Sequence, residues 1–180
     1  MTILKTKRVK LTILTMFMVL GFFHPVFAES GAALFKKGKA AAKSGSKEFA
    51  FLYFREALSR SPKAHFSDDA LFALGEYCLS LNNYAYAAKY FNQYISTYPK
   101  SDVKIFACSY LLSLAKIDKK EDLIKELEKE IVTFYNLSLL FSEFKEYNYR
   151  SAFSKKYKAR YYIDRVEIYI DGAIATQISY

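Results

Sequence analysis

The stretch GAALFKKGKAAAKSGSKEFAFLYFREALSRSP, residues 31–62, is followed by a second stretch of the same length, DDALFALGEYCLSLNNYAYAAKYFNQYISTYP, residues 68–99. When their final prolines are superposed, the same residue types recur at five positions: Leu34 and Leu71, Gly38 and Gly75, Ala50 and Ala87, Phe54 and Phe91, and Pro62 and Pro99. Recurrence of small, aromatic and proline residues at fixed offsets indicates a repeated structural unit.

The spacing within each stretch predicts a pair of antiparallel helices. In the second stretch Gly75 lies in the middle of the first predicted helix, where glycine costs about 1 kcal/mol relative to alanine. Close approach of the second helix at Ala87 would compensate for this cost, and Phe91, one turn later, would fill the space beside the contact. Pro99 ends the second helix, because proline removes a backbone hydrogen bond and clashes with the preceding turn. One pair cannot bury its apolar faces alone, so neighbouring pairs should stack.

These residues resemble the tetratricopeptide repeat (TPR) family, from which the two units depart at Lys37 and Tyr94. The offset between the units, 37 residues from Gly38 to Gly75, exceeds the usual repeat length of about 34. That offset is similar to the periplasmic subgroup that includes the outer-membrane β-barrel assembly lipoprotein and the Tol-Pal coordinator, although this chain lacks a lipobox. The resemblance implies a mainly α fold, a TPR-type helix-turn-helix superhelix that acts as a scaffold.

The resemblance also implies a groove lined by the first helix of each unit. The residues at the groove positions, which we take as candidate partner-binding residues, are Phe35, Lys39, Phe72, Glu76, Phe106 and Tyr110. A phenylalanine recurs at the same position of all three first helices. These rings either pack between adjacent helices or form an aromatic row that holds an extended or helical peptide, since buried rings carry much of the binding energy of such contacts.

Downstream residues predict a degenerate third unit and a helical cap. The pair Ser101-Asp102 can accept hydrogen bonds from the free backbone N–H groups at the start of a helix. The segment KKEDLIKELEKEIVTFY, residues 119–135, has one apolar stripe and a charged opposite face, which predicts an amphipathic helix at the end of the array. Residues 137–149 predict a further short capping helix.

The chain after Arg150 has the composition of β-strands and contains Asp171-Gly172, a favoured pair for a two-residue hairpin turn. This turn predicts a C-terminal β-hairpin with the cross-strand pairs Ile170 with Ala173, Ile168 with Ala175, and Val166 with Gln177. An isolated hairpin is marginally stable in water. We therefore expect it either to dock on the helix predicted at residues 137–149, through Leu139, Leu140 and Phe144, or to add its free edge to a partner's sheet.

The N-terminus has the pattern of a secretory signal. Basic residues at positions 5–10 precede an apolar run at 11–23, and small residues precede a cut between Ala28 and Glu29. The alternative, an uncleaved membrane anchor, needs a longer apolar run of about 20 residues. The predicted organisation is a signal peptide at 1–28, helical repeats at 29–135, and a capping helix with a β-hairpin at 136–180. The mature protein is predicted to be secreted into the periplasm.

The net charge of +9 is unevenly distributed along the chain. Four bases lie in the predicted signal peptide, and a second excess lies in residues 145–165, whose bases are Lys145, Arg150, Lys155, Lys156, Lys158, Arg160 and Arg165. This local excess is either a solvated patch or a contact site for an acidic partner, a lipid head group or a cell-wall polymer. No nucleic-acid partner is predicted.

Motifs that carry catalytic or metal chemistry are lacking in the sequence. The predicted mature chain has a single histidine, His65, and two cysteines, Cys78 and Cys108, which either bridge or stay as buried apolar residues. No phosphate loop, HExxH or GxSxG motif occurs. The sequence therefore predicts a non-enzymatic envelope scaffold without metal or cofactor, which binds a partner protein or peptide in outer-membrane or secretion-system assembly. The alternatives are a cell-wall or anionic membrane-surface binder that uses the basic segment, and a structural subunit that stacks on its own copies.

Overall fold

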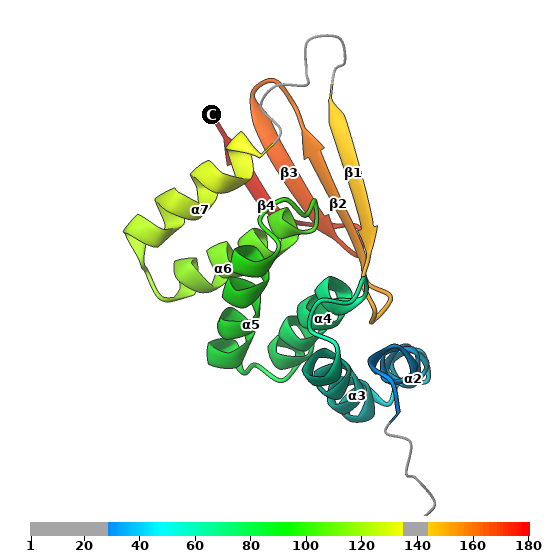
Figure 1. Cartoon of the computed structure of the whole chain (residues 1–180). Coiled ribbons are helices and arrows are strands. Elements are labelled where there is room, and N and C mark those ends of the chain that lie inside the picture. Colours follow the sequence, from blue (N-terminus) through cyan, green and yellow to red (C-terminus); the bar gives the residue numbers. More distant parts are fainter. Residues whose placement is uncertain (1–28, 135–143) are drawn as a thin grey trace, which may run out of the picture.

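A row of helices followed by a β-sheet makes up the described part of the chain. The computed structural model describes residues 29–134 and 144–180, and the predicted signal peptide lies outside these ranges. Within them there are six helices and one four-stranded antiparallel sheet at the C-terminus (Figure 1). The prediction of a mainly helical protein with a C-terminal β segment is confirmed, but the β segment is twice the predicted size.

Each helix packs against the next one along the chain. The bounds are α2, Gly31–Lys43; α3, Lys47–Arg60; α4, Ser67–Ser80; α5, Tyr84–Thr97; α6, Lys104–Ile117; and α7, Glu121–Thr133. In Figure 1 the row bends into an arc, and the sheet lies on its inner side. None of the described helices is both long enough and apolar enough to cross a membrane. Helix α7 buries Leu127 and Ile131 on one side, as predicted for an amphipathic terminal helix.

The two repeated glycines lie against aromatic rings. A Cβ atom added to Gly75 would lie 2.6 Å from Phe91 Cε1, and one added to Gly38 would lie 2.5 Å from Phe54 Cε1. Both distances are too short for a methyl group, so each glycine makes room for a ring of the following helix. The closest contact is therefore the phenylalanine and not the alanine one turn earlier, although that alanine is fully buried in both units.

The predicted cap at Ser101-Asp102 is displaced from the helix start. Helix α6 begins at Lys104 and its cap position is Val103, which makes no side-chain capping bond. The Ser101 hydroxyl instead accepts a hydrogen bond from the Val103 backbone N–H at 3.2 Å and lies 2.8 Å from the Tyr94 hydroxyl. Ser101 therefore fastens the loop that precedes α6 to helix α5.

The sheet is an antiparallel meander with the strand order β1-β2-β3-β4. Its strands are β1, Lys145–Arg150; β2, Lys156–Tyr161; β3, Arg165–Ile170; and β4, Ala173–Ser179. The helix predicted at residues 137–149 is wrong for its second half, which is β1. The physical reason is a period of two: Tyr147 and Tyr149 face the helices, while Asn148 is exposed on the other side. The first part of that predicted helix falls mostly in residues 135–143, outside the described ranges.

The hairpin turn at Asp171-Gly172 is confirmed, but the predicted register holds only beside the turn. Ile170 pairs with Ala173, whereas Ile168 pairs with Thr176 and not with Ala175. The difference arises from an irregularity between Ile168 and Tyr169, where β4 has one extra residue, as in a β-bulge. Beyond this point Val166 pairs with Ile178 instead of Gln177. The shift brings Thr176 and Ile178 to the buried side of the sheet.

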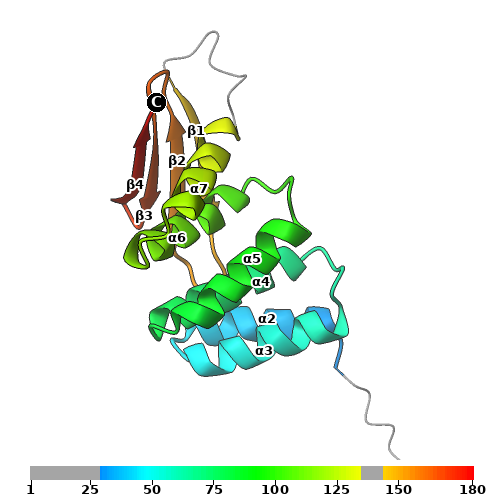
Figure 2. The ribbon, with the colours of Figure 1, turned by 90° about the vertical axis from the view of Figure 1, so that its left-hand side faces the viewer.

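The sheet docks on helices, but not on the predicted one. Helix α6 contacts β4, and helix α7 contacts β3. Figure 2 shows α6 and α7 beside the sheet, while α2 and α3 lie at the other end of the molecule. The Ser109 hydroxyl of α6 lies 2.6 Å from the Thr176 hydroxyl of β4, and the Tyr161 hydroxyl of β2 donates to the Ile131 carbonyl of α7 at 3.0 Å. These buried bonds fix the sheet to the end of the helical row.

The two cysteines are free and buried. Burial raises the pKa of both thiols, that of Cys108 to about 12. Neutral buried thiols behave as small apolar side chains, which was one of the two readings that the sequence left open. In this structure they form no disulfide.

The contact between Gly75 and Phe91 can be tested by a double-mutant cycle. Gly75→Ala should lower the free energy of unfolding by about 1–3 kcal/mol, because the clash with the ring outweighs a gain of about 1 kcal/mol in helix propensity. In a Phe91→Leu background the same change should cost less, since leucine leaves room for the methyl group. Urea unfolding measures both. Lys89→Ala, an exposed change on α5, is the control, and an equal cost in both backgrounds would contradict the contact.

Candidate functional site

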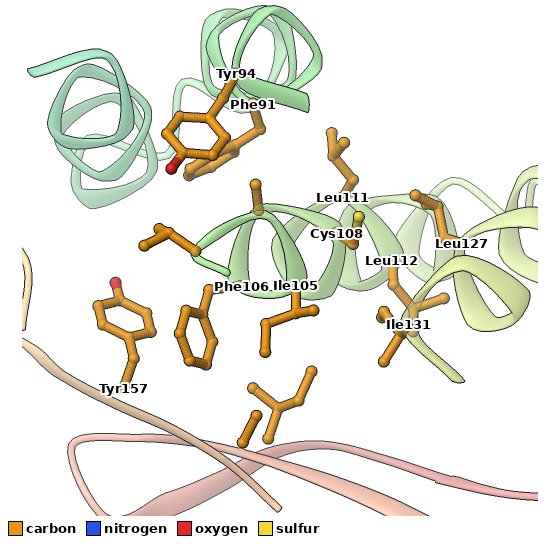
Figure 3. Packing of buried hydrophobic residues seen from close by; sticks show 14 of the residues in the cluster. Phe91, Tyr94, Ile105, Phe106, Cys108, Leu111, Leu112, Leu127, Ile131 and Tyr157 are labelled. Atoms are coloured by element: carbon orange, nitrogen blue, oxygen red, sulfur yellow. The ribbon is translucent and has the colours of Figure 1, made fainter. Parts of the chain in front are cut away.

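The residues predicted to line a groove are mostly covered by the chain's own sheet. Phe72 and Phe106 have no exposed surface, and Glu76 is 2% exposed. Strands β1 and β2 lie over them. In Figure 3 Phe106 of α6 and Tyr157 of β2 lie side by side between the helix and the strand. Phe72, Glu76 and Phe106 therefore contact the chain's own sheet in this structure.

Tyr157 is the residue on which four of the six predicted positions meet. Its ring lies 5.5 Å from the ring of Phe72 and 5.1 Å from that of Phe106, measured between centroids. Its hydroxyl donates to Glu76 Oε1 at 2.5 Å. The Tyr110 hydroxyl lies 2.7 Å from the Tyr157 hydroxyl oxygen. Because Tyr157 gives its own proton to Glu76, Tyr110 is the donor in this second bond. The ring of Tyr157 thus packs on the two phenylalanines, and its hydroxyl forms hydrogen bonds with Glu76 and Tyr110.

A second tyrosine, Tyr149, lies directly opposite Tyr157 on β1 and repeats this arrangement. The Tyr149 hydroxyl of β1 donates to Asp69 Oδ1 at 2.7 Å, and its ring meets Phe72 edge-on at 5.6 Å. Burial raises the pKa of Asp69, and the bond from Tyr149 opposes this shift. Two acids of α4 therefore each receive a tyrosine hydroxyl from the sheet. A partner could reach the covered residues only if the sheet moved away.

Phe35 and Lys39 lie apart from this cluster. The half-buried ring of Phe35 stacks on Phe66 at 4.9 Å and lies 5.5 Å from Phe54. The Lys39 ammonium group is exposed, 5.8 Å from the centre of the Phe35 ring. The structure therefore does not place the six predicted residues in one site. That they contact a partner stays a prediction.

Burial changes the chemistry of Glu76. Desolvation raises the pKa of its carboxyl from 4.5 to about 7, even though the bond from Tyr157 and the charge of Lys155 favour the ionised form. Glu76 thus changes its charge near neutral pH. Within the described residues no cluster of His, Cys, Asp and Glu side chains is suited to hold a metal ion.

The opposite face of the sheet carries the bases that the sequence analysis noted as a local excess. Tyr157, Ala159 and Tyr161 of β2 are buried, so the alternating Lys156, Lys158 and Arg160 lie on the other side. They border a hollow of about 580 Å³ that we call the basic cleft, lined by Asn148, Tyr149, Arg150, Lys156, Tyr157, Lys158, Arg160, Tyr169 and Gly172. The sequence grouped these bases as a local excess and a possible contact site, but did not place them on one face of a sheet, although uncharged residues and bases alternate along residues 156–161.

Among the described residues, ion pairs occur at one end of the basic cleft, whereas at the other end the Asp171 carboxylate accepts a hydrogen bond from the Lys156 backbone N–H at 2.8 Å. Glu146 binds Arg160 at 2.7 Å and lies 3.6 Å from Lys158. Hydrogen bonds from Asn148 and Arg160 lower the pKa of Glu146, and the bond from Asn148 has the larger effect. At the other end Arg150 and Lys156 are directly opposite each other across β1 and β2, and neither has an ion pair with any residue in ranges 29–134 and 144–180. Like charges opposite each other destabilise a sheet, so a bound anion would relieve this repulsion.

The pKa of Glu76 predicts how stability depends on pH. The folded state binds the Glu76 proton more tightly than the unfolded chain, so this group's contribution to the free energy of unfolding is lost as pH rises from about 4.5 to 7. The loss should be roughly 2–3 kcal/mol. Glu76→Gln should remove this part of the pH dependence, measured by urea unfolding at pH 5 and pH 8, whereas Glu126→Gln on the exposed face of α7 should keep it. Identical slopes for Glu76→Gln and the wild type would contradict the assignment.

Comparisons with known proteins give no family for this chain. No protein-family model matches the sequence, and no curated protein matches it. The candidate site is therefore defined by its own geometry: an inner row of acids and rings closed by the sheet, and a basic cleft open to solvent.

Proposed function

We propose that this protein is a non-enzymatic scaffold that holds an acidic segment of a partner protein in the basic cleft of its sheet. The cations and the amide that border the cleft bind anions through charge and hydrogen bonds. The helical row supports the sheet from the inner side and leaves this face open. Electrostatic complementarity of this kind increases the rate and the specificity of association.

The opposed pair Arg150 and Lys156 is the observation that carries this proposal. Two cations in register, without an ion pair among the described residues, have a cost that a carboxylate placed between them would remove. Lys158 and Arg160 continue the row of positive charge, although each is already within reach of Glu146. The bases nearest the β1–β2 turn should therefore contribute most to binding.

The cleft extends across several strands, which suits an extended segment of a partner chain. Its lining comes from β1, β2 and β3. The side-chain amide of Asn148 donates to Glu146 at 2.9 Å and has a second N–H group to offer beside the bases.

A second candidate function is attachment to an anionic membrane surface. Ile174 supports it, because this residue is 55% exposed and pairs with Tyr169 on the neighbouring strand. Basic residues beside an exposed apolar side chain are typical of membrane-surface contacts.

The helical part fits a proposal of TPR-type repeats. Gly38 and Gly75 make the same contact with Phe54 and Phe91 in successive helix pairs, which supports a repeated unit. In this proposal the chain's own β1 and β2 occupy the position that the resemblance assigns to a peptide, and the partner binds outside. The basic and apolar segments at residues 5–23 support a location in the cell envelope.

Binding of a fluorescent oligoglutamate peptide tests the proposal. Anisotropy should show binding that weakens with ionic strength, and Arg150→Ala combined with Lys156→Ala should weaken it by at least about tenfold. The matched control is Lys63→Ala combined with Lys89→Ala, two exposed bases on the helical part, which should change affinity by less than about twofold. Equal effects of the two double variants would contradict the cleft as the binding site.

Vesicle co-sedimentation separates the two candidate functions. If the cleft binds a protein segment, oligoglutamate should bind while vesicles with anionic phosphatidylglycerol capture the protein weakly. Capture by these vesicles that is lost in Ile174→Ser and in the Arg150, Lys156 double variant would favour the membrane function instead.

A further inference from the structure

The outer face of the sheet around the basic cleft is a regular array of charged and polar side chains. Each base of β2 has one direct neighbour on β1 and another on the side of β3. The β2 residues are Lys156, Lys158 and Arg160, their β1 neighbours are Arg150, Asn148 and Glu146, and their neighbours on the other side are Asp171, Tyr169 and Glu167. An extended segment of a partner could run along these strands or cross them.

The charges of this array favour a segment that runs along β2. In that direction the outer face presents three bases in succession without an acid among them. A path across the strands would meet Asp171 beside Lys156, or Glu146 and Glu167 on either side of Arg160, and the middle row has only one base. An acidic segment is therefore attracted over its whole length only when it follows β2.

Glu146 shows how a carboxylate binds on this face. It lies 2.7 Å from Arg160 Nε and 3.6 Å from Lys158 Nζ, so one carboxylate from the neighbouring strand reaches toward two successive bases of β2. Arg160 also has Glu167 as its neighbour on β3, although Glu167 itself binds Arg165 at 2.8 Å. The charge of Arg160 is therefore already balanced within the sheet.

The other two positions of the β2 row are available to acids of a partner. Lys156 and its neighbour Arg150 are exposed, and neither has an ion pair within the part of the chain that the structure describes. Lys158 is too far from Glu146 for a hydrogen bond, and 36% of its side chain is exposed. Its neighbour on β1 is the amide Asn148, which adds no charge.

The spacing of these two positions determines the spacing of the acids that fit them. Successive residues of an antiparallel strand advance by about 3.4 Å, so Lys156 and Lys158 are separated by about 6.8 Å along one face. In an extended ligand, residues i and i+2 have the same separation and point to the same side, whereas adjacent residues point to opposite sides. An acid at i+4 would meet Arg160, whose charge is already balanced by Glu146.

We propose, given that the basic cleft is the partner-binding site of the proposed function, that it recognises an extended segment with two acidic residues separated by one residue. One acid binds between Arg150 and Lys156, and the other binds Lys158. The residue between the two acids faces solvent and can be of any type. A third acid, two residues beyond Lys158, would approach Glu146 and add no affinity.

Capped seven-residue threonine peptides with two glutamates test the spacing, because threonine favours extended backbone and the caps remove the terminal charges. They compete with the fluorescent oligoglutamate peptide for the full chain. Thr-Thr-Glu-Thr-Glu-Thr-Thr should compete at least about threefold better than Thr-Thr-Glu-Glu-Thr-Thr-Thr or Thr-Glu-Thr-Thr-Thr-Glu-Thr, a ratio that corresponds to one further exposed ion pair. The three peptides have the same composition and net charge, so a difference between them reports the spacing alone.

Two variants assign the preference to the bases of β2. Lys158→Gln should reduce the preference for alternating glutamates to less than about 1.5-fold, whereas its control Lys129→Gln, exposed on α7, should keep it. Glu146→Gln frees Arg160, so the peptide with glutamates at i and i+4 should then compete at least about threefold better. Glu126→Gln on α7 is the control for this gain. If Glu146→Gln fails to fold by circular dichroism, Lys158→Gln decides alone, because its side chain lies on the outer face.

The outcomes separate this acid spacing from the proposed function. If oligoglutamate binds in the cleft but the three glutamate peptides compete equally, or none competes at about 10 mM, the spacing is wrong while the cleft stays the binding site. A preference that persists in Lys158→Gln would place the second acid elsewhere and would also overturn the spacing. If oligoglutamate does not bind, or binds the Arg150, Lys156 double variant equally well, both proposals are wrong.

Discussion

The hydrogen bond from the Tyr157 hydroxyl to Glu76 Oε1 at 2.5 Å determines how the sheet sits on the helices. It ties a strand to a carboxyl on α4 that would otherwise be buried without a donor, which is costly. A shift of β2 by one residue would turn Tyr157 outward and direct Lys156 and Lys158 into the core. The same bond therefore fixes the inner face of the sheet and places the bases of the outer face in the basic cleft.

The acids of α4 explain why a sheet and not an unrelated segment covers the inner face. Asp69 and Glu76 are seven residues apart, which is two helical turns, so both lie on one side of α4. Strands β1 and β2 each supply one tyrosine to them, Tyr149 and Tyr157, at 2.7 and 2.5 Å. A tyrosine side chain supplies both a hydrogen-bond donor and a large apolar ring. One residue type can therefore donate to the two acids and pack against the neighbouring phenylalanines.

Local constraints were predictable from the sequence, and long-range ones were not. Glycine, proline and phenylalanine at fixed offsets predicted the first two helix pairs, and Asp171-Gly172 predicted the turn between β3 and β4, because each acts within one or two elements. The β1 strand was missed, since the apolar residues before it resemble a helix and its own alternation spans only six residues. The contact of Tyr157 with Glu76 joins residues 81 positions apart. No local sequence pattern could therefore predict that the sheet covers the predicted groove positions on α4 and α6.

Opening the groove would require a partner that replaces what the sheet provides. Moving β1 and β2 away would expose Phe72 and Phe106 together with Tyr157, and burial of each such ring is worth about 1.5–3 kcal/mol. It would also leave Glu76 and Asp69 without their tyrosine donors. The combined cost approaches the free energy of unfolding of a typical domain, about 5–15 kcal/mol. The basic cleft needs no such rearrangement, because Arg150 and Lys156, which have no ion pair among the described residues, are already exposed to solvent. This difference in free energy is the reason to place partner binding on the outer face of the sheet.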